Sequence, residues 1–326
     1  MNIHRFIRIF AIITSIVTYL VILLGVLVTT TNSGHGCGNT WPFCHGQIIP
    51  NVITVAGLIE YNHRIISTLD GTLVLVLTVW AWFMYRPDFR VKLFAFLSLL
   101  FVVLQGALGA LTVMFEGTLA LTWILSIHFG LSLIAFASVI LLTIRLFQVG
   151  RERQDRQAQI YSAVPRLQLP VWSLAIYTYI VVYTGALVEH TGAVTGCGTS
   201  LPGCGSTYLP GFATLAGIQV LHRYAAALLW LLVLCLLLVV LRSYRQRRDL
   251  VLGAWWAFGL ITLQAGSGLI NVWSAGQLLA TLVHTTLIAV FFSVLCYFCV
   301  QVGWPWQKKN LAQNTESNQL EMKTVP

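Results

Sequence analysis

The chain has 326 residues, of which 57% are hydrophobic and only 9% are charged, and its formal net charge is +9. The mean hydropathy is +0.81. Such a composition excludes an ordinary soluble domain, in which about a quarter of the residues are charged.

Eight apolar runs are long enough to cross the roughly 30 Å hydrocarbon core of a bilayer. We therefore predict an all-α polytopic membrane protein with eight transmembrane helices. In chain order the predicted helices are residues 7–30, 56–84, 91–114, 119–147, 169–189, 213–241, 251–272 and 277–301.

Lysine and arginine are distributed unevenly among the connections between these helices. The connections 31–55 and 190–212 contain neither residue. The positive-inside rule therefore predicts that both termini are cytoplasmic and that these two connections lie outside. The net positive charge follows from this topology, and we do not interpret it as nucleic-acid binding. The basic residues lie before the first helix, between the second and third helices, in the central linker, after the sixth helix and in the tail. Examples, in that order, are Arg5, Arg90, Arg151, Arg245 and Lys308.

The two halves of the chain repeat one pattern. Cys37 and Cys44 recur 160 residues later as Cys197 and Cys204 (197 − 37, 204 − 44). Four helices is an even number, so the halves insert in the same orientation, as two four-helix bundles related by a pseudo-twofold axis along the membrane normal. The predicted units are residues 1–147 and 169–303, a cytoplasmic linker 148–168 and a cytoplasmic tail 304–326 that we expect to be disordered.

The four cysteines of the outer connections are expected to form the disulfides Cys37–Cys44 and Cys197–Cys204, because thiols outside the cytoplasm oxidise. The disulfides could staple their loops, or the first could be redox-active. His35 and His45 flank the first pair only, and a metal or proton role for them stays open. The remaining cysteines, Cys235, Cys296 and Cys299, are interpreted as packing residues within helices.

Four histidines lie inside predicted helices, one in each even-numbered helix: His63, His128, His222 and His284. Ionisable side chains are costly in a membrane and are functional candidates by default. Each lies roughly 7 to 10 residues, or about 10–15 Å, inside the outer end of its helix. Two histidines at matched depth in a four-helix bundle are typical of bis-imidazole haem ligation. The predicted pairs are His63 with His128 and His222 with His284.

Further repeated residues accompany the histidines. Arg64 and Arg223 could bind haem propionates through charge-assisted hydrogen bonds, or they could extend toward lipid headgroups. Gln105 and Gln264 could bridge helices or line a pocket, and nearby glycines permit close approach of a helix or of a flat macrocycle. These glycines are Gly106, Gly109, Gly266 and Gly268.

The halves differ at one position next to the histidines. Glu60 lies three residues before His63, whereas Gln219 lies three residues before His222. Residues three apart share a helix face, and a carboxylate there can relay protons whereas an amide cannot. The asymmetry suggests that the first half reacts and the second stores an electron. Asp70, deeper in the same helix, could serve a proton path or a buried polar contact.

These residues resemble the heme A synthase family, in its bacterial form with two extracytoplasmic cysteine pairs, over residues 1 to about 303. The resemblance is carried by Cys37-x6-Cys44, by the segment Glu60-Tyr61-Asn62-His63-Arg64, by His128, by Leu221-His222-Arg223 and by His284. The glutamate three residues before the first histidine is the most specific of these features.

The resemblance implies an oxidoreductase of the bacterial cell membrane that serves cytochrome oxidase biogenesis. It would oxidise the methyl group at position 8 of haem O to a formyl group by successive hydroxylations, which gives haem A. Residues 1–147 would bind the substrate haem O through His63 and His128, with Glu60 as the catalytic residue. Residues 169–303 would hold haem b as a permanent cofactor between His222 and His284.

The resemblance also implies partners and leaves alternatives. Heme O synthase could deliver the substrate, and a quinol or a ferredoxin-like protein could donate electrons, while the oligomeric state stays open. An alternative function is a di-haem b membrane cytochrome that transfers electrons from quinol, which shares the four histidines but does not explain Glu60 against Gln219. A second alternative is a quinone-linked disulfide oxidoreductase built on the outer cysteines.

Overall fold

A computed structural model describes residues 3–51, 54–152 and 164–305. Within these ranges the chain forms eight long α-helices and one 3-10 turn, Ala193–Thr195. Each helix is long and apolar enough to cross a membrane, which confirms the predicted all-α class. The helices are α1 (Ile3–Thr30), α2 (Val55–Met84), α3 (Phe89–Met114), α4 (Ala120–Glu152), α5 (Pro165–His190), α6 (Leu215–Ser243), α7 (Arg248–Trp273) and α8 (Leu278–Val302).

The helix ends lie close to the predicted ones, with the largest differences beside the central linker. There α4 continues to Glu152, and α5 begins at Pro165, where the fixed φ of proline suits the first turn of a helix. Most of the predicted linker, residues 153–163, lies outside the described residues, as do residues 306–326 of the predicted tail.

The duplicated helices α2 and α6 begin in the same way. Thr54 precedes α2 and Thr214 precedes α6, and each hydroxyl accepts a hydrogen bond at 3.0 Å from the backbone N–H three residues later. A threonine in this position satisfies one of the free N–H groups of the first turn. The repeat therefore places the start of both histidine-bearing helices at equivalent points after the cysteine loops.

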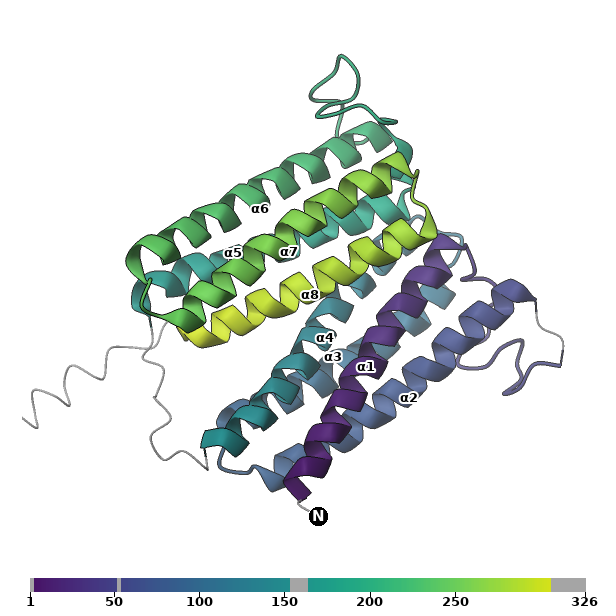
Figure 1. Cartoon of the computed structure of the whole chain (residues 1–326). Coiled ribbons are helices and arrows are strands. Elements are labelled where there is room, and N and C mark those ends of the chain that lie inside the picture. Colours follow the sequence, from purple (N-terminus) through teal and green to yellow (C-terminus); the bar gives the residue numbers. More distant parts are fainter. Residues whose placement is uncertain (1–2, 52–53, 153–163, 306–326) are drawn as a thin grey trace, which may run out of the picture.

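The helices form two four-helix bundles, α1–α4 and α5–α8, which pack side by side (Figure 1). Helices α1 and α4 of the first bundle contact α5 and α8 of the second. An apolar cluster fills part of this interface, and it includes Ile22, Leu133, Val182 and Phe292. The interface places helix α4, which carries His128, directly against helix α5 of the other half.

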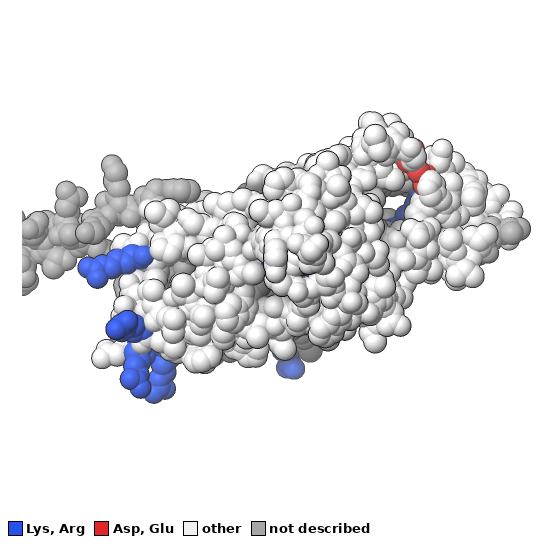
Figure 2. Space-filling model, turned by 90° about the horizontal axis from the view of Figure 1, so that it is seen from above, with Lys and Arg blue, Asp and Glu red and all other residues white. Residues whose placement is uncertain are grey.

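The two ends of the molecule differ in charge and in connections. Both cysteine loops project from one end, and α1 begins at the other (Figure 1). In Figure 2 most of the visible Lys and Arg lie at the left end, with one more at the lower middle and one beside the acidic residue towards the right. Exposed arginines lie in and beside the α6–α7 connection: Arg242 in the last turn of α6, Arg245 in the connection and Arg248 at the start of α7. Large exposed apolar side chains such as Leu231 and Trp256 cover the middle, as expected for a surface that faces lipid.

Candidate functional site

The four predicted histidines occupy equivalent places in the two bundles. Each lies within about three turns of the start of its helix, on α2, α4, α6 or α8. Each imidazole is partly buried. His128 lies within electrostatic range of His63 and also of His190 at the end of α5, and His284 lies within range of His222. The structure therefore brings together the two pairs that the sequence predicted, one in each bundle.

Every one of these imidazoles rests against a glycine of the preceding helix. A Cβ atom built on Gly25 would lie 3.5 Å from Cε1 of His63, and one on Gly109 would lie 3.9 Å from Cε1 of His128. In the second half the contacts are tighter, 2.9 Å between Gly185 and His222 and 3.2 Å between Gly268 and His284. Because glycine has no side chain, each of these positions leaves space for the imidazole ring of the next helix.

Two of these glycines, Gly109 and Gly268, are among the residues predicted from the repeat, whereas Gly25 and Gly185 are not. Gly25 and Gly185 also obey the repeat, since they are 160 residues apart (185 − 25). That offset was the signal that could have found them. Gly106 and Gly266, by contrast, have no neighbouring atom within 4 Å of their Cβ positions.

The repeated glutamines tie adjacent helices together at the histidines. Gln105 on α3 donates from Nε2 to the backbone oxygen of His128 at 3.0 Å. Gln264 on α7 contacts His284 differently, through its Nε2 and the imidazole Nε2 at 3.1 Å. Both therefore bridge helices, but only Gln264 touches an imidazole.

Both outer cysteine pairs are disulfides, as expected. The Cα atoms of Cys37 and Cys44 are 4.5 Å apart, and those of Cys197 and Cys204 are 4.8 Å apart. Of the three helix cysteines, Cys299 is buried, Cys296 is half-buried and Cys235 is exposed. The disulfides thus close two short loops above the histidine-bearing helices.

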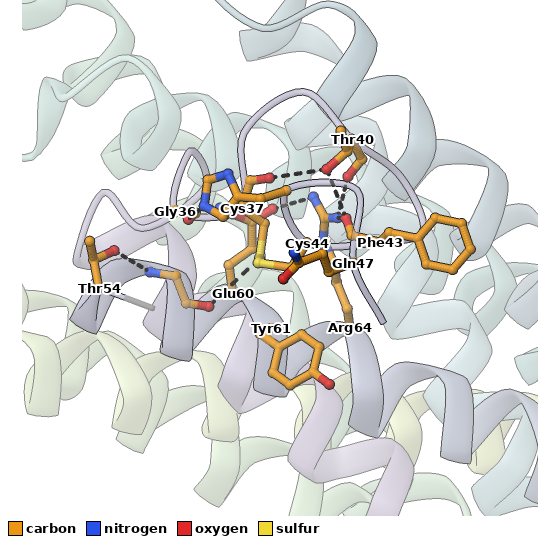
Figure 3. Close-up of a disulfide and its surroundings, with 12 residues drawn as sticks. Gly36, Cys37, Thr40, Phe43, Cys44, Gln47, Thr54, Glu60, Tyr61 and Arg64 are labelled. Carbon is orange, nitrogen blue, oxygen red and sulfur yellow. Dashed lines mark hydrogen bonds and ion pairs between the residues drawn. A yellow bond between two sulfur atoms is a disulfide. The ribbon is translucent and has the colours of Figure 1, made fainter. Parts of the chain in front are cut away.

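Glu60 connects the first cysteine loop to helix α2 (Figure 3). Its side chain is 5% exposed. One carboxylate oxygen accepts the backbone N–H of Cys37 at 2.8 Å, and the other accepts Nη2 of Arg64 at 2.5 Å. Arg64 also donates from Nη1 to the carbonyl oxygens of Thr40 and Phe43, at 2.6 and 2.7 Å. The carboxylate and the guanidinium together hold the loop against the helix.

The second half keeps one of these bonds and changes the rest. Gln219 accepts the N–H of Cys197 at 2.8 Å, and its Nε2 donates to the carbonyl oxygen of Val194 at 2.6 Å. Arg223 donates from Nη1 to the carbonyl oxygen of Ser200 at 2.6 Å. Its Nε and Nη2 are buried and have no partner among the described residues.

The two repeated arginines therefore differ in their need for an anion. Glu60 already neutralises Arg64, whereas Arg223 has buried N–H groups that no carboxylate meets. An unpaired buried cation is costly, and a carboxylate is the group that a guanidinium binds best. Arg223, two imidazoles and their glycines thus fit a flat iron macrocycle that carries propionates.

The first half has additional ionisable groups at its outer end. His35 forms an ion pair with Glu116, which lies in the α3–α4 connection. Burial raises the pKa of the Glu116 carboxyl; His35 opposes this shift, and the negative charge of Glu60 adds to it. His45 contacts the carbonyl oxygen of Gly36 through Nε2 at 3.1 Å. The structure thus ties His35 to the neighbouring connection and His45 to its own loop.

Asp70 makes a buried polar contact within the first bundle. Its carboxylate accepts the hydroxyl of Thr18 on α1 at 2.7 Å, and its side chain is buried. The contact joins α1 to α2 below the level of His63. Of the two roles left open by the sequence, this geometry supplies the polar contact.

The chain is similar to proteins of known identity over nearly its whole length. The family model described as COX15-CtaA, cytochrome oxidase assembly protein, matches residues 8–54 and 51–296. The heme A synthase of Bacillus pumilus (strain SAFR-032) is 38% identical over 297 residues, which cover 91% of this chain and 95% of the relative. That of Bacillus mycoides (strain KBAB4) is 37% identical over 320 residues, or 98% and 100% of the two chains. That of Halalkalibacterium halodurans is 36% identical over 296 residues, or 90% and 96%.

Proposed function

The chain belongs to the COX15-CtaA family of cytochrome oxidase assembly proteins, and on that premise we propose that it acts as a heme A synthase, an oxidoreductase that converts haem O to haem A. The match to relatives named heme A synthase extends over both bundles and both cysteine loops. The methyl group at position 8 would be hydroxylated twice, with dioxygen as the oxidant and the electron donor supplying two electrons to each hydroxylation, and the resulting gem-diol would lose water to leave the formyl group.

The two halves divide the work in this proposal. Residues 1–147 bind the substrate haem O between His63 and His128, and residues 169–303 hold haem b between His222 and His284. The observation that carries the assignment is the contrast between the arginines. The buried, unpaired N–H groups of Arg223 suit the propionate of a resident haem. The resident haem supplies an iron that accepts and donates single electrons.

Glu60 is the proposed proton acceptor of the substrate half. Its carboxylate lies one helical turn from His63, and a carboxylate can take up a proton released during oxidation. The backbone N–H of Cys37 and Nη2 of Arg64 both donate to this carboxylate and hold it in place. Gln219 has the same contact to its cysteine loop but no group that can accept a proton, so the second half can hold a haem without oxidising it.

The proposed location is the bacterial cell membrane, with both termini in the cytoplasm and both cysteine loops outside. Its support is that the connections 31–55 and 190–212 contain no Lys or Arg, while most of the Lys and Arg visible in Figure 2 lie at one end. A hydrophobic substrate such as haem O would enter from the bilayer or directly from heme O synthase. A quinol or a ferredoxin-like protein would donate electrons to the resident haem.

Analysis of bound pigments tests the function directly. The purified membrane protein is extracted with acid acetone, and the pigments are separated by chromatography and identified by mass spectrometry. We expect haem B together with a farnesylated haem: O, A or a hydroxylated intermediate. Haem B alone in both halves, from a host that makes haem O, would favour the di-haem cytochrome. Protein without haem would overturn the histidine assignment.

The variant Glu60→Gln tests the catalytic assignment. Gln219 accepts the N–H of its cysteine loop as Glu60 does, so Glu60→Gln keeps the acceptor for Cys37 and removes the proton acceptor. We expect haem A formation to fall by about 100-fold or more. The disulfide, measured by thiol titration, and the haem b content serve as controls and should be unchanged. Undiminished haem A formation would contradict the role of Glu60.

A further inference from the structure

The second half gives each histidine a hydroxyl partner. The hydroxyl of Thr184 on α5 lies 2.9 Å from Nδ1 of His222. The hydroxyl of Ser267 on α7 lies 2.8 Å from Nδ1 of His284. Each of these residues directly precedes the glycine against which the same imidazole rests, Gly185 or Gly268. One helix turn therefore supplies both the room for the ring and a partner for its nitrogen.

The hydroxyls also determine which ring nitrogen carries the proton. Thr184 donates its hydroxyl proton to the carbonyl oxygen of Val181 at 2.7 Å, and Ser267 donates to that of Gln264 at 2.9 Å. A hydroxyl has one proton to give, so while it donates to the carbonyl oxygen it can only accept from an Nδ1–H. The proton then lies on Nδ1, and the lone pair for iron lies on Nε2.

The first half lacks these partners. Nδ1 of His63 and Nδ1 of His128 are both buried without a hydrogen-bond partner among the described residues. The residue before Gly25 is Leu24, which is 160 positions before Thr184 (184 − 24). The residue before Gly109 is Leu108, which is 159 positions before Ser267 (267 − 108). Two leucines thus stand where the second half has two hydroxyls.

A hydrogen bond to the outer nitrogen changes how an imidazole holds a metal. It fixes the tautomer and the ring orientation, and it raises the basicity of the ligating nitrogen; losing such a partner typically costs about 10- to 100-fold in metal affinity. The closer glycine contacts of His222 and His284 restrict their rings further, at 2.9 and 3.2 Å against 3.5 and 3.9 Å in the first half. Among the described residues, the second pair therefore has hydroxyl partners and a closer helix approach that the first pair lacks.

We propose that Thr184 and Ser267 are positioning residues that make the second half the site of a resident haem. Leu24 and Leu108, which offer no hydrogen bond to an imidazole, leave the histidines of the first half able to release their haem. An enzyme whose substrate and product are both haems needs one site that retains its ligand and one that exchanges it. The inference rests on the proposed function and assigns that difference to two hydroxyls.

Loss of haem b from hydroxyl variants tests the resident site. Thr184→Val and Ser267→Ala are purified, and transfer of haem b to an excess of apomyoglobin is followed by absorbance. We expect transfer to be about 10-fold faster or more than from the unaltered protein, with altered g-values of the low-spin haem in electron paramagnetic resonance. Thr184→Ser should restore slow transfer because it keeps the hydroxyl.

The matched control is Thr178→Val, which removes a buried hydroxyl from the same helix. Thr178 bonds only to the carbonyl oxygen of Leu174 one turn earlier, so its loss should leave haem transfer unchanged. Equal acceleration in Thr178→Val would show a general packing effect and would overturn the inference. Unchanged transfer from both Thr184→Val and Ser267→Ala would overturn it as well.

The converse variant, Leu24→Thr with Leu108→Ser, tests the exchanging site. We expect haem bound to the first half to transfer at least several-fold more slowly, with the transfer of haem b unchanged. Faster or unchanged transfer from the first half would count against the inference. A purified protein without any haem would instead sink the proposed function, whereas haem b that stays bound in every hydroxyl variant would sink this inference alone.

Discussion

Gly185 has only a hydrogen atom as its side chain, and this allows the imidazole of His222 to pack against helix α5. A methyl group there would come within 2.9 Å of the imidazole, whereas at Gly109 it would remain 3.9 Å from His128. We predict that Gly185→Ala displaces the ring and lowers haem b content, and that Gly109→Ala is tolerated. Alanine is the better helix former by about 1 kcal/mol, so helix stability does not oppose either change.

The measurement is the haem content per chain by pyridine haemochromogen spectra, with circular dichroism as a check that both variants keep their helices. If Gly185→Ala retains haem b as firmly as Gly109→Ala does, the glycine contact does not position His222.

At the residue scale, the candidate ligands and the candidate catalytic residue could be predicted from the sequence. The residues that position these side chains could not. His63, Glu60 and the cysteines are visible because polar or reactive residues are rare in apolar helices. Thr184 and Ser267 are not visible in this way, since hydroxyl residues are common in such helices and usually bond to their own backbone. Only packing of one helix against the next shows which hydroxyl meets an imidazole.

Among the elements, helix α3 depends on the residue that precedes it. Asp88 caps the helix by accepting the N–H of Val91 at 3.0 Å, and it also accepts two hydrogen bonds from Arg145 on α4. Burial alone would raise the pKa of Asp88, but the hydrogen bonds and charge of Arg145 outweigh it and hold the pKa below its ordinary 3.8.

This shift predicts a pH dependence of stability. A carboxyl whose pKa is lower in the folded state contributes stability above its ordinary pKa and loses it as the pH falls through the folded value. The thermal midpoint in detergent should therefore fall below about pH 4, and less steeply in Asp88→Asn, which has no carboxyl to protonate. An equally steep fall in Asp88→Asn would show that other carboxyls carry the effect.

The variant Asp88→Ala separates the cap from the ion pair. Asparagine caps a helix about as well as aspartate, whereas alanine does not. We expect Asp88→Ala to be less stable than Asp88→Asn by about 1 kcal/mol at neutral pH, measured by denaturant unfolding in detergent. Equal stability of the two variants would show that the cap contributes nothing.

The elements themselves were predictable because hydropathy alone defines a helix that crosses a bilayer. Their ends beside the linker were less so, since α4 and α5 continue past the apolar runs into polar residues. The contact between His35 and Glu116 could not be predicted either. It joins two connections that are far apart in the chain. Neither connection has a hydrophobic periodicity from which its neighbour in the fold could be predicted.

For the molecule as a whole, the duplication predicts that the two haem sites can be emptied independently. Each histidine pair lies within one bundle, although His128 also lies within electrostatic range of His190 on α5, and hydrogen bonds such as that of Tyr19 with Thr286 join the bundles elsewhere. We predict that His222→Ala or His284→Ala removes haem b, and that His63→Ala or His128→Ala leaves haem b bound while abolishing conversion of haem O. The measurement is haem analysis of each purified variant.

Retention of haem b in the His222→Ala and His284→Ala variants, together with its loss in the other two, would exchange the roles of the halves. Loss from all four would mean that the bundles fold as one unit around both ligands. Size-exclusion chromatography separates that case from simple misfolding.

The histidine contacts all lie between helices that are consecutive in the chain: α1 with α2, α3 with α4, α5 with α6 and α7 with α8. Each histidine therefore finds the glycine it packs against within its own helical hairpin, before the later hairpins emerge from the ribosome. Insertion of a hairpin thus already places one imidazole beside its glycine, and a haem iron in either bundle would then be bound by one histidine from each of its two hairpins.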